Sequence, residues 1–338
     1  MTAALAARQG LSERWYATPA DAIRRLTPLQ AQHPPAPYLA LGARLHAFRR
    51  TDLEDAITAR SVVKTSINRH TLHLVHHDDY PAYAQLTRQA RMRAWRNRYA
   101  HLDEQRTADA LTEFFQQPRT NPEIRERVLE FEPEPDGPWT AVMFVRDLLP
   151  LIQLPPAGHW DDPRRAGFVI DPRPLPEPRE AARIVLEQYL NAFGPASKKD
   201  VAGWAGVAQR DFDFDAIETV TYRDEHGTLL YDLPDRTIEP AELPPRFLGH
   251  WDQVLLAYKD RDRILPSELK HHNLTITGDP TVTVDGRVAA IWAHDGDRLT
   301  ITPLVKLTKR QRAAIETEAQ RPARLCGALH VELHGDPA

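Results

Sequence analysis

The stretch Pro178–Val207, "PREAARIVLEQYLNAFGPASKKDVAGWAGV", decides the fold. Apolar residues recur at three- and four-residue spacing on both sides of its Gly-Pro pair, which predicts two helices joined by a tight turn. Ser197 stands where its hydroxyl can cap the second helix. A third short helix is predicted over residues 213–220, and residues 220–233 alternate as a hairpin. Three helices followed by a hairpin are typical of a winged helix, a helix-turn-helix variant.

The same rhythm occurs twice before this stretch, and the end of the chain differs from it. Proline clusters, above all the run over 171–180, mark the joints between units. From Ala289 onward, alternating strands surround one helix, which predicts a small β-rich module. We therefore predict an α+β chain of tandem winged-helix domains followed by a small C-terminal β-barrel. The predicted units are 1–105 (winged helix 1), 106–178 (winged helix 2 and linker), 179–245 (winged helix 3) and 246–338 (barrel). The predicted helices are 19–30, 38–48, 52–63, 80–102, 108–117, 121–131 and 139–154, with strands at 71–75 and 167–170.

Composition limits the possible compartments and partners. The 338 residues include one cysteine, Cys326, so no internal disulfide can form and a reducing compartment is expected. The N-terminus lacks the pattern of a secretory signal, and no apolar run approaches the roughly 20 residues that span a bilayer. We expect a cytoplasmic protein with no membrane contact. The net charge is −4, yet residues 1–110 hold 16 Lys and Arg against 10 Asp and Glu. A basic front on an acidic body suggests a surface that faces a polyanion.

Two further stretches are candidates for DNA contact. The run over 88–98, "RQARMRAWRNR", places five arginines on one predicted helix around Trp95, where either a solvated helix face or phosphate contact would fit. The run "RHTLHLVHH" holds four histidines, but on a strand they do not share one face, and no metal or cofactor motif accompanies them. We expect neither a metal nor a cofactor. The candidate DNA contacts are Arg69, His70, Thr71, His73, Arg88, Arg91 and Arg96.

The stretch Leu29–His33, "LQAQH", places Gln30 and Gln32 where a helical pattern breaks into prolines. This run, the following "PPAPYLALGARL" and "NRHTLHLV" resemble the winged-helix DNA glycosylases of the AlkZ and YcaQ type. "YLNAFGPASKKDVAGWAGV", "RFLGHWDQVLLAYKDRDRIL" and "PTVTVDGRVAAIW" match further along, so the resemblance covers nearly the whole chain in order. That family carries a Gln-Φ-Gln or Gln-Φ-Asp motif, and Gln30 and Gln32 match the AlkZ-like Gln-Φ-Gln branch.

The resemblance implies a monofunctional DNA glycosylase whose catalytic residues are Gln30 and Gln32. Its implied substrate is double-stranded DNA with cationic N7-alkylguanine lesions, including bulky adducts or interstrand crosslinks. A cationic purine leaves C1′ readily, so two amides that hold a water beside C1′ can replace a carboxylate. No lysine accompanies the glutamines in sequence, so a Schiff-base lyase step is not indicated. We expect the enzyme to act as a monomer and to leave an abasic site.

Two other functions fit the same pattern. A winged-helix protein can bind DNA without catalysis, as a regulator, or can serve as a protein-interaction scaffold through its acidic C-terminal half. DNA binding without base release would favour the regulator. Failure to bind DNA even at low salt would favour the scaffold.

Overall fold

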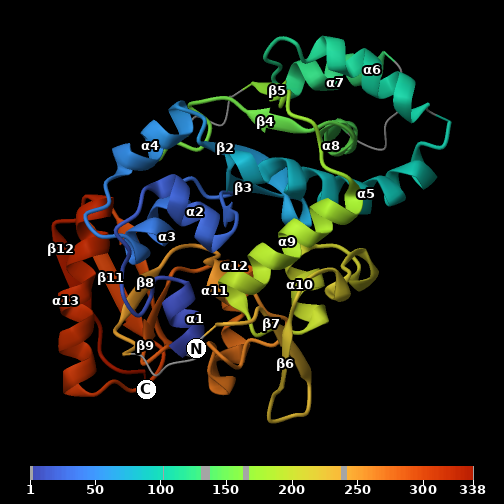
Figure 1. Ribbon diagram of the computed structural model, residues 1–338. Coiled ribbons are helices and arrows are strands. Elements are labelled where there is room, and N and C mark those ends of the chain that lie inside the picture. Colours follow the sequence, from blue (N-terminus) through green and yellow to red (C-terminus); the bar gives the residue numbers. More distant parts are fainter. Residues whose placement is uncertain (1–2, 102, 131–137, 163–166, 237–241, 338) are drawn as a thin grey trace.

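The computed structural model describes residues 3–101, 103–130, 138–162, 167–236 and 242–337 (Figure 1). The described residues form two five-stranded sheets, one two-stranded hairpin and helices packed around them, which confirms the α+β class. The last residues of two predicted helices, Leu102 and Phe131, lie outside the described residues. The division into four domains stays a prediction.

The first unit contains the helices and strands that carry the glutamine motif. The first helices are α1 (Ala3–Arg8) and α2 (Pro19–Leu26). Thr18 caps α2, because its hydroxyl accepts a hydrogen bond from the Asp21 amide at 3.2 Å. The short strand β1 (Leu29–Gln30) follows, then α3 (Ala36–Arg44) and α4 (Arg50–Thr58). Strands β2 (Val62–Ile67) and β3 (Thr71–His76) form an antiparallel pair. One hydrophobic cluster, which includes Tyr38, Leu53 and Leu74, joins these elements.

The second unit extends the same sheet. It comprises α5 (Tyr80–Arg98), α6 (Glu104–Phe114), α7 (Asn121–Leu129), α8 (Pro138–Leu148), β4 (Leu151–Gln153) and β5 (Phe168–Ile170). The strand order is β1-β3-β2-β4-β5, because β4 pairs with β2 at Lys64 and Gln153. A buried ion pair between Lys64 and Asp162 lies beside this junction. The first two predicted units therefore share one sheet.

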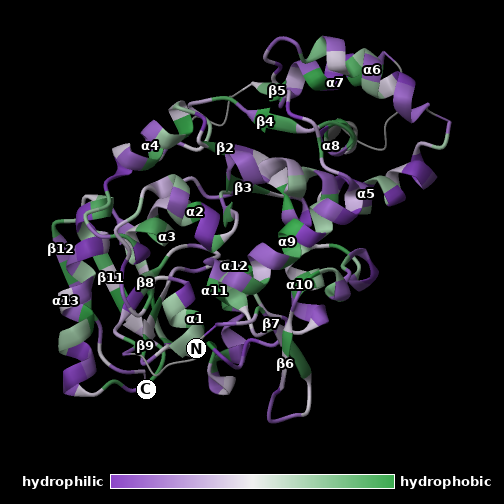
Figure 2. Cartoon of the chain, in the orientation of Figure 1, coloured by the Kyte–Doolittle hydropathy of each residue, from purple (hydrophilic) through white to green (hydrophobic). Residues whose placement is uncertain are grey.

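The opening stretch of the sequence folds largely as expected. Helix α9 (Pro178–Phe193) crosses the middle of the molecule and packs on α5 (Figure 1). The Ser197 hydroxyl caps α10 (Lys198–Ala205) by accepting from the Asp200 amide at 3.3 Å. Strands β6 (Val220–Arg223) and β7 (Leu229–Asp232) form the predicted hairpin, whose connecting loop is mostly hydrophilic (Figure 2).

The predicted third helix over 213–220 is wrong. Only a single 3-10 turn, Phe214–Ala216, forms there. The Asp213 carboxylate accepts from the Asp215 amide at 3.1 Å, and Ile217 is already extended. This local carboxylate–amide bond favours a turn over a continuing helix.

The C-terminal unit is a sheet backed by one long helix. Its strands are β8 (Arg246–Leu248), β9 (Thr281–Val284), β10 (Arg287–Asp295), β11 (Arg298–Pro303) and β12 (His330–Leu333), with α11 (Gln253–Leu256) and α12 (Leu274–Thr277) inserted and α13 (Lys309–Cys326) packed against it. The order is β12-β11-β10-β9-β8. The pairings among the described residues leave β12 and β8 as edges, so they do not close the predicted barrel. None of the helices in the described part of the chain is long and apolar enough to span a membrane.

Candidate active site

The glutamine motif lies on an extended segment between α2 and α3. Helix α2 ends at Leu26, the following Thr27 has a φ of 70°, and the chain then pairs with β3. The Ala31 amide donates to the Leu72 carbonyl at 2.7 Å. Ala31 enters the hydrophobic core, whereas Gln30 ends β1 and Gln32 lies in the bend that follows.

The two glutamines differ in their surroundings. Gln30 is buried, at 9% exposure, and its Oε1 atom accepts no hydrogen bond from any residue that the structure describes. Gln32 is exposed, and its Oε1 accepts from the Leu72 amide at 3.2 Å. A carbonyl oxygen has two lone pairs, so both side chains can accept a further hydrogen bond. A buried acceptor without a partner is unusual and indicates a place for water or ligand.

His73 lies opposite Gln30 in the β1–β3 pairing and is fully buried. Its Nδ1 is 2.9 Å from the Thr71 carbonyl, so Nδ1–H donates to that oxygen. Burial lowers the pKa of His73 to about 3, and nearby Arg69 and Arg91 act in the same direction. His73 is therefore neutral at physiological pH. Thr71 donates to the Asn68 carbonyl at 3.1 Å, so both residues order the β2–β3 turn.

That turn places Arg69 beside the third unit. Arg69 and His70 have φ values of 54° and 60°, and the Arg69 guanidinium donates to the Trp204 carbonyl of α10 at 3.2 Å. Gly206 follows α10, and a Cβ atom there would come within 2.8 Å of the Arg69 amide nitrogen. Glycine at 206 is thus required for the close approach of the two segments.

A cavity of about 970 Å³ has Gln30, Arg69 and Trp204 in its lining. Four cations line it together with Gln30, and none of its lining residues is a carboxylate. Burial lowers the pKa of Arg69, with a further contribution from the positive charge of Arg261. Such a site attracts a polyanion, since bound phosphates would relieve the repulsion between the guanidinium groups. The four cations are Arg69, Lys199, Lys259 and Arg261.

Sequence reasoning missed three of these cations and the tryptophan beside them. Lys199 lies in "ASKKD", and Trp251, Lys259 and Arg261 lie in "HWDQVLLAYKDRD". Both segments belong to the stretches that carry the family resemblance, but they lie far from the glutamines in sequence. The available signal for a role of these residues in binding was their position at helix ends and in connecting turns.

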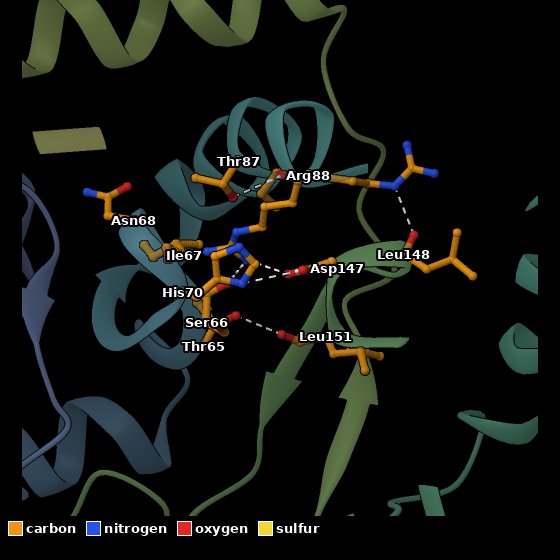
Figure 3. A network of polar contacts seen from close by, with 12 residues as sticks. Thr65, Ser66, Ile67, Asn68, His70, Thr87, Arg88, Asp147, Leu148 and Leu151 are labelled. Atoms are coloured by element: carbon orange, nitrogen blue, oxygen red, sulfur yellow. Dashed lines mark hydrogen bonds and ion pairs between the residues drawn. The ribbon is translucent and has the colours of Figure 1, made fainter. Parts of the chain in front are cut away.

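The arginines of α5 lie in a different setting (Figure 3). Arg91 is buried; it pairs with Asp147 at 2.7 Å and also donates to the Ile67 carbonyl. The exposed His70 ring lies 3.4 Å from the same carboxylate. Trp95 donates to Asp147 at 2.7 Å and packs against the second unit's core. The buried position of Arg91 does not fit a phosphate contact.

Arg88 and Arg96 also have protein partners. The Arg88 Nε donates to the Leu148 carbonyl at 2.8 Å, and its guanidinium lies 3.3 Å from Glu104. The Arg96 Nε lies 2.8 Å from Glu104 and remains largely exposed. The structure therefore brings Gln30, His73 and Arg69 together and places Arg88, Arg91 and Arg96 around α5.

Comparisons with known proteins bear on the family and the fold. The family model described as "DNA glycosylase AlkZ-like" matches residues 23–325. A relative from Streptomyces sahachiroi, named an interstrand DNA cross-link repair glycosylase, is 31% identical over 166 residues; the match spans 45% of each chain, less than half of that relative's length. The solved structure of Streptomyces sahachiroi DNA glycosylase AlkZ has the same fold, with a TM-score of 0.81 and 24% identity over 98% of this chain and 97% of that one. The family match spans most of the chain and includes Gln30, Gln32 and every cavity residue named above. This protein therefore belongs to the AlkZ-like DNA glycosylase family.

Proposed function

We propose that this protein is a monofunctional DNA glycosylase that releases N7-alkylated guanine from double-stranded DNA and leaves an abasic site. One observation supports the proposal beyond family membership: Gln30, whose buried carbonyl oxygen has no partner among the described residues, belongs to the lining of a cavity that also holds four cations. The cations suit the phosphates of a duplex. The unpartnered Gln30 carbonyl oxygen retains its capacity to accept a hydrogen bond from a water held beside the sugar.

The substrate's own charge explains why amides suffice. In N7-alkylguanine the base is cationic, and when the bond between N9 and C1′ breaks, its electron pair neutralises the leaving base. The water oxygen bonds to C1′, and its proton passes to solvent. Gln30 and Gln32 orient that water through their carbonyl oxygens, which also stabilise the positive charge developing at the sugar. No cofactor takes part in this step.

The proposed DNA contacts follow the cavity. Arg69, Lys199, Lys259 and Arg261 bind phosphates, His70 lies beside Arg69 on the same turn, and Thr71 and His73 hold that turn in place. The three helical units act as tandem winged helices along the duplex, and the enzyme works as a monomer. Arg88 and Arg96 remain candidates for outer contacts.

We extend the proposal to bulky N7 adducts and interstrand crosslinks. One observation supports this extension: the Streptomyces sahachiroi relative is named for crosslink repair. Release of bulky N7 adducts would distinguish this proposal from repair of small lesions alone.

The test is base release. The protein is incubated with a duplex that contains one N7-methylguanine, and alkali then cleaves abasic sites. We expect strand breaks at the lesion, and none with the Gln30→Ala/Gln32→Ala double variant. Duplex binding without release, from this lesion or a bulkier N7 adduct, would instead indicate a regulator. Failure to bind DNA at low salt would indicate a scaffold.

A further inference from the structure

Trp251 has a backbone conformation that bulky residues rarely adopt. Its φ is 47°, in the left-handed region that is unfavourable for a large side chain. Such residues persist only where the surrounding structure determines them, and they cluster at functional sites. The strain at Trp251 therefore needs a structural cause.

Both flanks of Trp251 are fixed. On the C-terminal side, Asp252 caps α11 and forms a fully buried double hydrogen bond with Arg44, at 2.7 and 2.8 Å. On the N-terminal side, Gly249 is packed so tightly on α3 that a Cβ atom would lie 2.8 Å from Leu39 Cβ. The two residues between these anchors, His250 and Trp251, form a turn in which Trp251 takes the left-handed conformation.

The indole is also fixed by its neighbours. A Cβ atom on Gly278 would lie 2.0 Å from the indole Cε2, so only glycine leaves room for the ring. His250 holds the same segment, because its Nδ1–H donates to the Gly278 carbonyl at 2.9 Å. The Gly278 backbone thus packs against the ring, and the His250 hydrogen bond joins the two segments.

The fixed indole lines the same cavity as Gln30. Two other aromatic rings line it, but Trp204 and Tyr258 are fully buried, whereas Trp251 is half-buried. Trp204 and Tyr258 also direct their polar atoms to Gln253 and the Phe193 carbonyl. Of these three aromatic residues in the cavity lining, Trp251 is therefore the most accessible to a ligand.

A cationic base in this cavity needs a favourable surface. The four cations repel it, and the lining holds no carboxylate to offset that repulsion. The face of an aromatic ring carries negative potential and attracts cations, tryptophan most strongly, while stacking also favours any planar base. A neutral guanine would gain only the stacking contribution.

We propose that Trp251 binds the alkylated purine ring through its indole face and gives the site its preference for cationic over neutral bases. Gln30 and Gln32 act at the sugar, and Trp251 acts on the base. This inference rests on the proposed function for its substrate, but the binding that it describes can be measured without catalysis.

The experiment measures binding to two duplexes that differ only at one nucleotide. One carries 2′-fluoro-N7-methyldeoxyguanosine, whose glycosidic bond resists cleavage, and the other carries 2′-fluorodeoxyguanosine. We expect the wild-type protein and Trp251→Phe to prefer the methylated duplex. Trp251→Asn removes the ring while asparagine tolerates the left-handed backbone, so it should fold and lose roughly ten-fold or more of that preference. Tyr16→Asn, which removes an exposed ring elsewhere, is the matched control.

The outcomes separate this inference from the proposed function. If Trp251→Asn keeps the wild-type preference, or weakens both duplexes equally, the inference is overturned. A wild-type protein without any preference would overturn it too, and base release by the same preparation would leave the proposed function intact. A preference that depends on Trp251, without release from the unfluorinated lesion, would support the inference and contradict the proposed function.

Discussion

Gln30 on β1 lies directly opposite His73 on β3, so the candidate catalytic amide and a buried neutral imidazole occupy paired positions of one sheet. The His73 Nδ1–H is committed to the Thr71 carbonyl. A proton on the other ring nitrogen would add a buried positive charge beside Arg69 and Arg91. The pairing therefore links the stability of the glutamine segment to the protonation of one histidine.

We predict that His73 makes the protein sensitive to mild acid. Its pKa is about 3 in the folded protein and about 6.5 when unfolded, so the unfolded state binds more protons between these values. Its contribution to stability is complete above pH 6.5 and falls as the pH drops toward 3, by roughly 2 kcal/mol at pH 5. Urea unfolding at pH 7 and pH 5 should show this loss. His73→Asn, which can still donate to Thr71, should show a smaller one; an identical loss would rule out His73 as its source.

We predict that Gln30→Ala and Gln32→Ala each reduce the rate of base release by about 10²–10³. The loss should leave stability nearly unchanged for exposed Gln32, within roughly 0.5 kcal/mol. Single-turnover release from an N7-methylguanine duplex measures the rate. Gln209→Ala is the matched control, because this exposed glutamine lines the same cavity away from β1. Gln32→Asp converts the motif to the family's other form and should retain activity. Early melting of Gln32→Ala with unchanged release would indicate a purely structural role.

We predict that Arg69 and Arg261 bind phosphates. Alanine at either position should weaken lesion and undamaged DNA alike and lower the slope of log K against log salt by about 0.9 per lost contact. Arg183→Ala, on the exposed side of α9 with Glu180 and Glu187 as partners, should change neither. Arg96→Ala tests whether α5 also touches the duplex. An unchanged slope in the Arg69/Arg261 double variant would place the DNA elsewhere.

We predict that Arg91 serves stability. Its partner Asp147 is fully buried and also accepts from Trp95, so Arg91→Ala leaves an uncompensated carboxylate. Breaking a buried pair from one side costs about 3–5 kcal/mol. Thermal unfolding should show an early transition, and the folded fraction should bind DNA with the wild-type salt slope. A stable Arg91→Ala protein with a lower slope would return this arginine to the DNA contacts.

We predict that borohydride traps no covalent complex with lesion DNA. The expectation from sequence that no lysine accompanies the glutamines does not hold in space, since Lys199 and Lys259 line the cavity. The proposed step uses water, so the sugar should never form an imine with either amine. Gel electrophoresis after reduction detects such a complex. A trapped band that disappears in Lys199→Arg or Lys259→Arg would assign a lyase step to that residue.

Local features were predictable from the sequence, and long-range ones were not. Apolar spacing predicts the helices around Gln30, but the predicted helices over 19–30 and 52–63 end too late, because their last residues form β1 and the start of β2. The cap at Ser197 follows from its position before a helix. Arg91 shows the limit, because its meaning depends on Asp147, which lies 56 residues away. The sequence of an arginine run is the same whether its side chains pair with a buried carboxylate or face solvent.

The candidate site shows the same division. The family resemblance identifies Gln30 and Gln32, although the helix predicted over 19–30 contains Gln30, which the structure places on β1. Three of the four cavity cations come from the third unit and from the segment after β8, far away in sequence. Only the packing of the β2–β3 turn on α10 brings them together. The missed strain at Trp251 has a similar origin, since it arises from anchors on α3 and near α12.

The sheet that joins β2 to β4 limits how this protein could have been assembled in evolution. A gene fragment that ended before Leu151 would leave β2 without its neighbour on one side, and an unpaired edge strand invites association with other chains. It would also leave the buried ammonium group of Lys64 without its partner Asp162. The glutamine segment is therefore not a portable module. It would have to be inherited together with the strands up to Ile170. A duplication or recombination breakpoint within the proline-rich run that follows would leave this sheet intact.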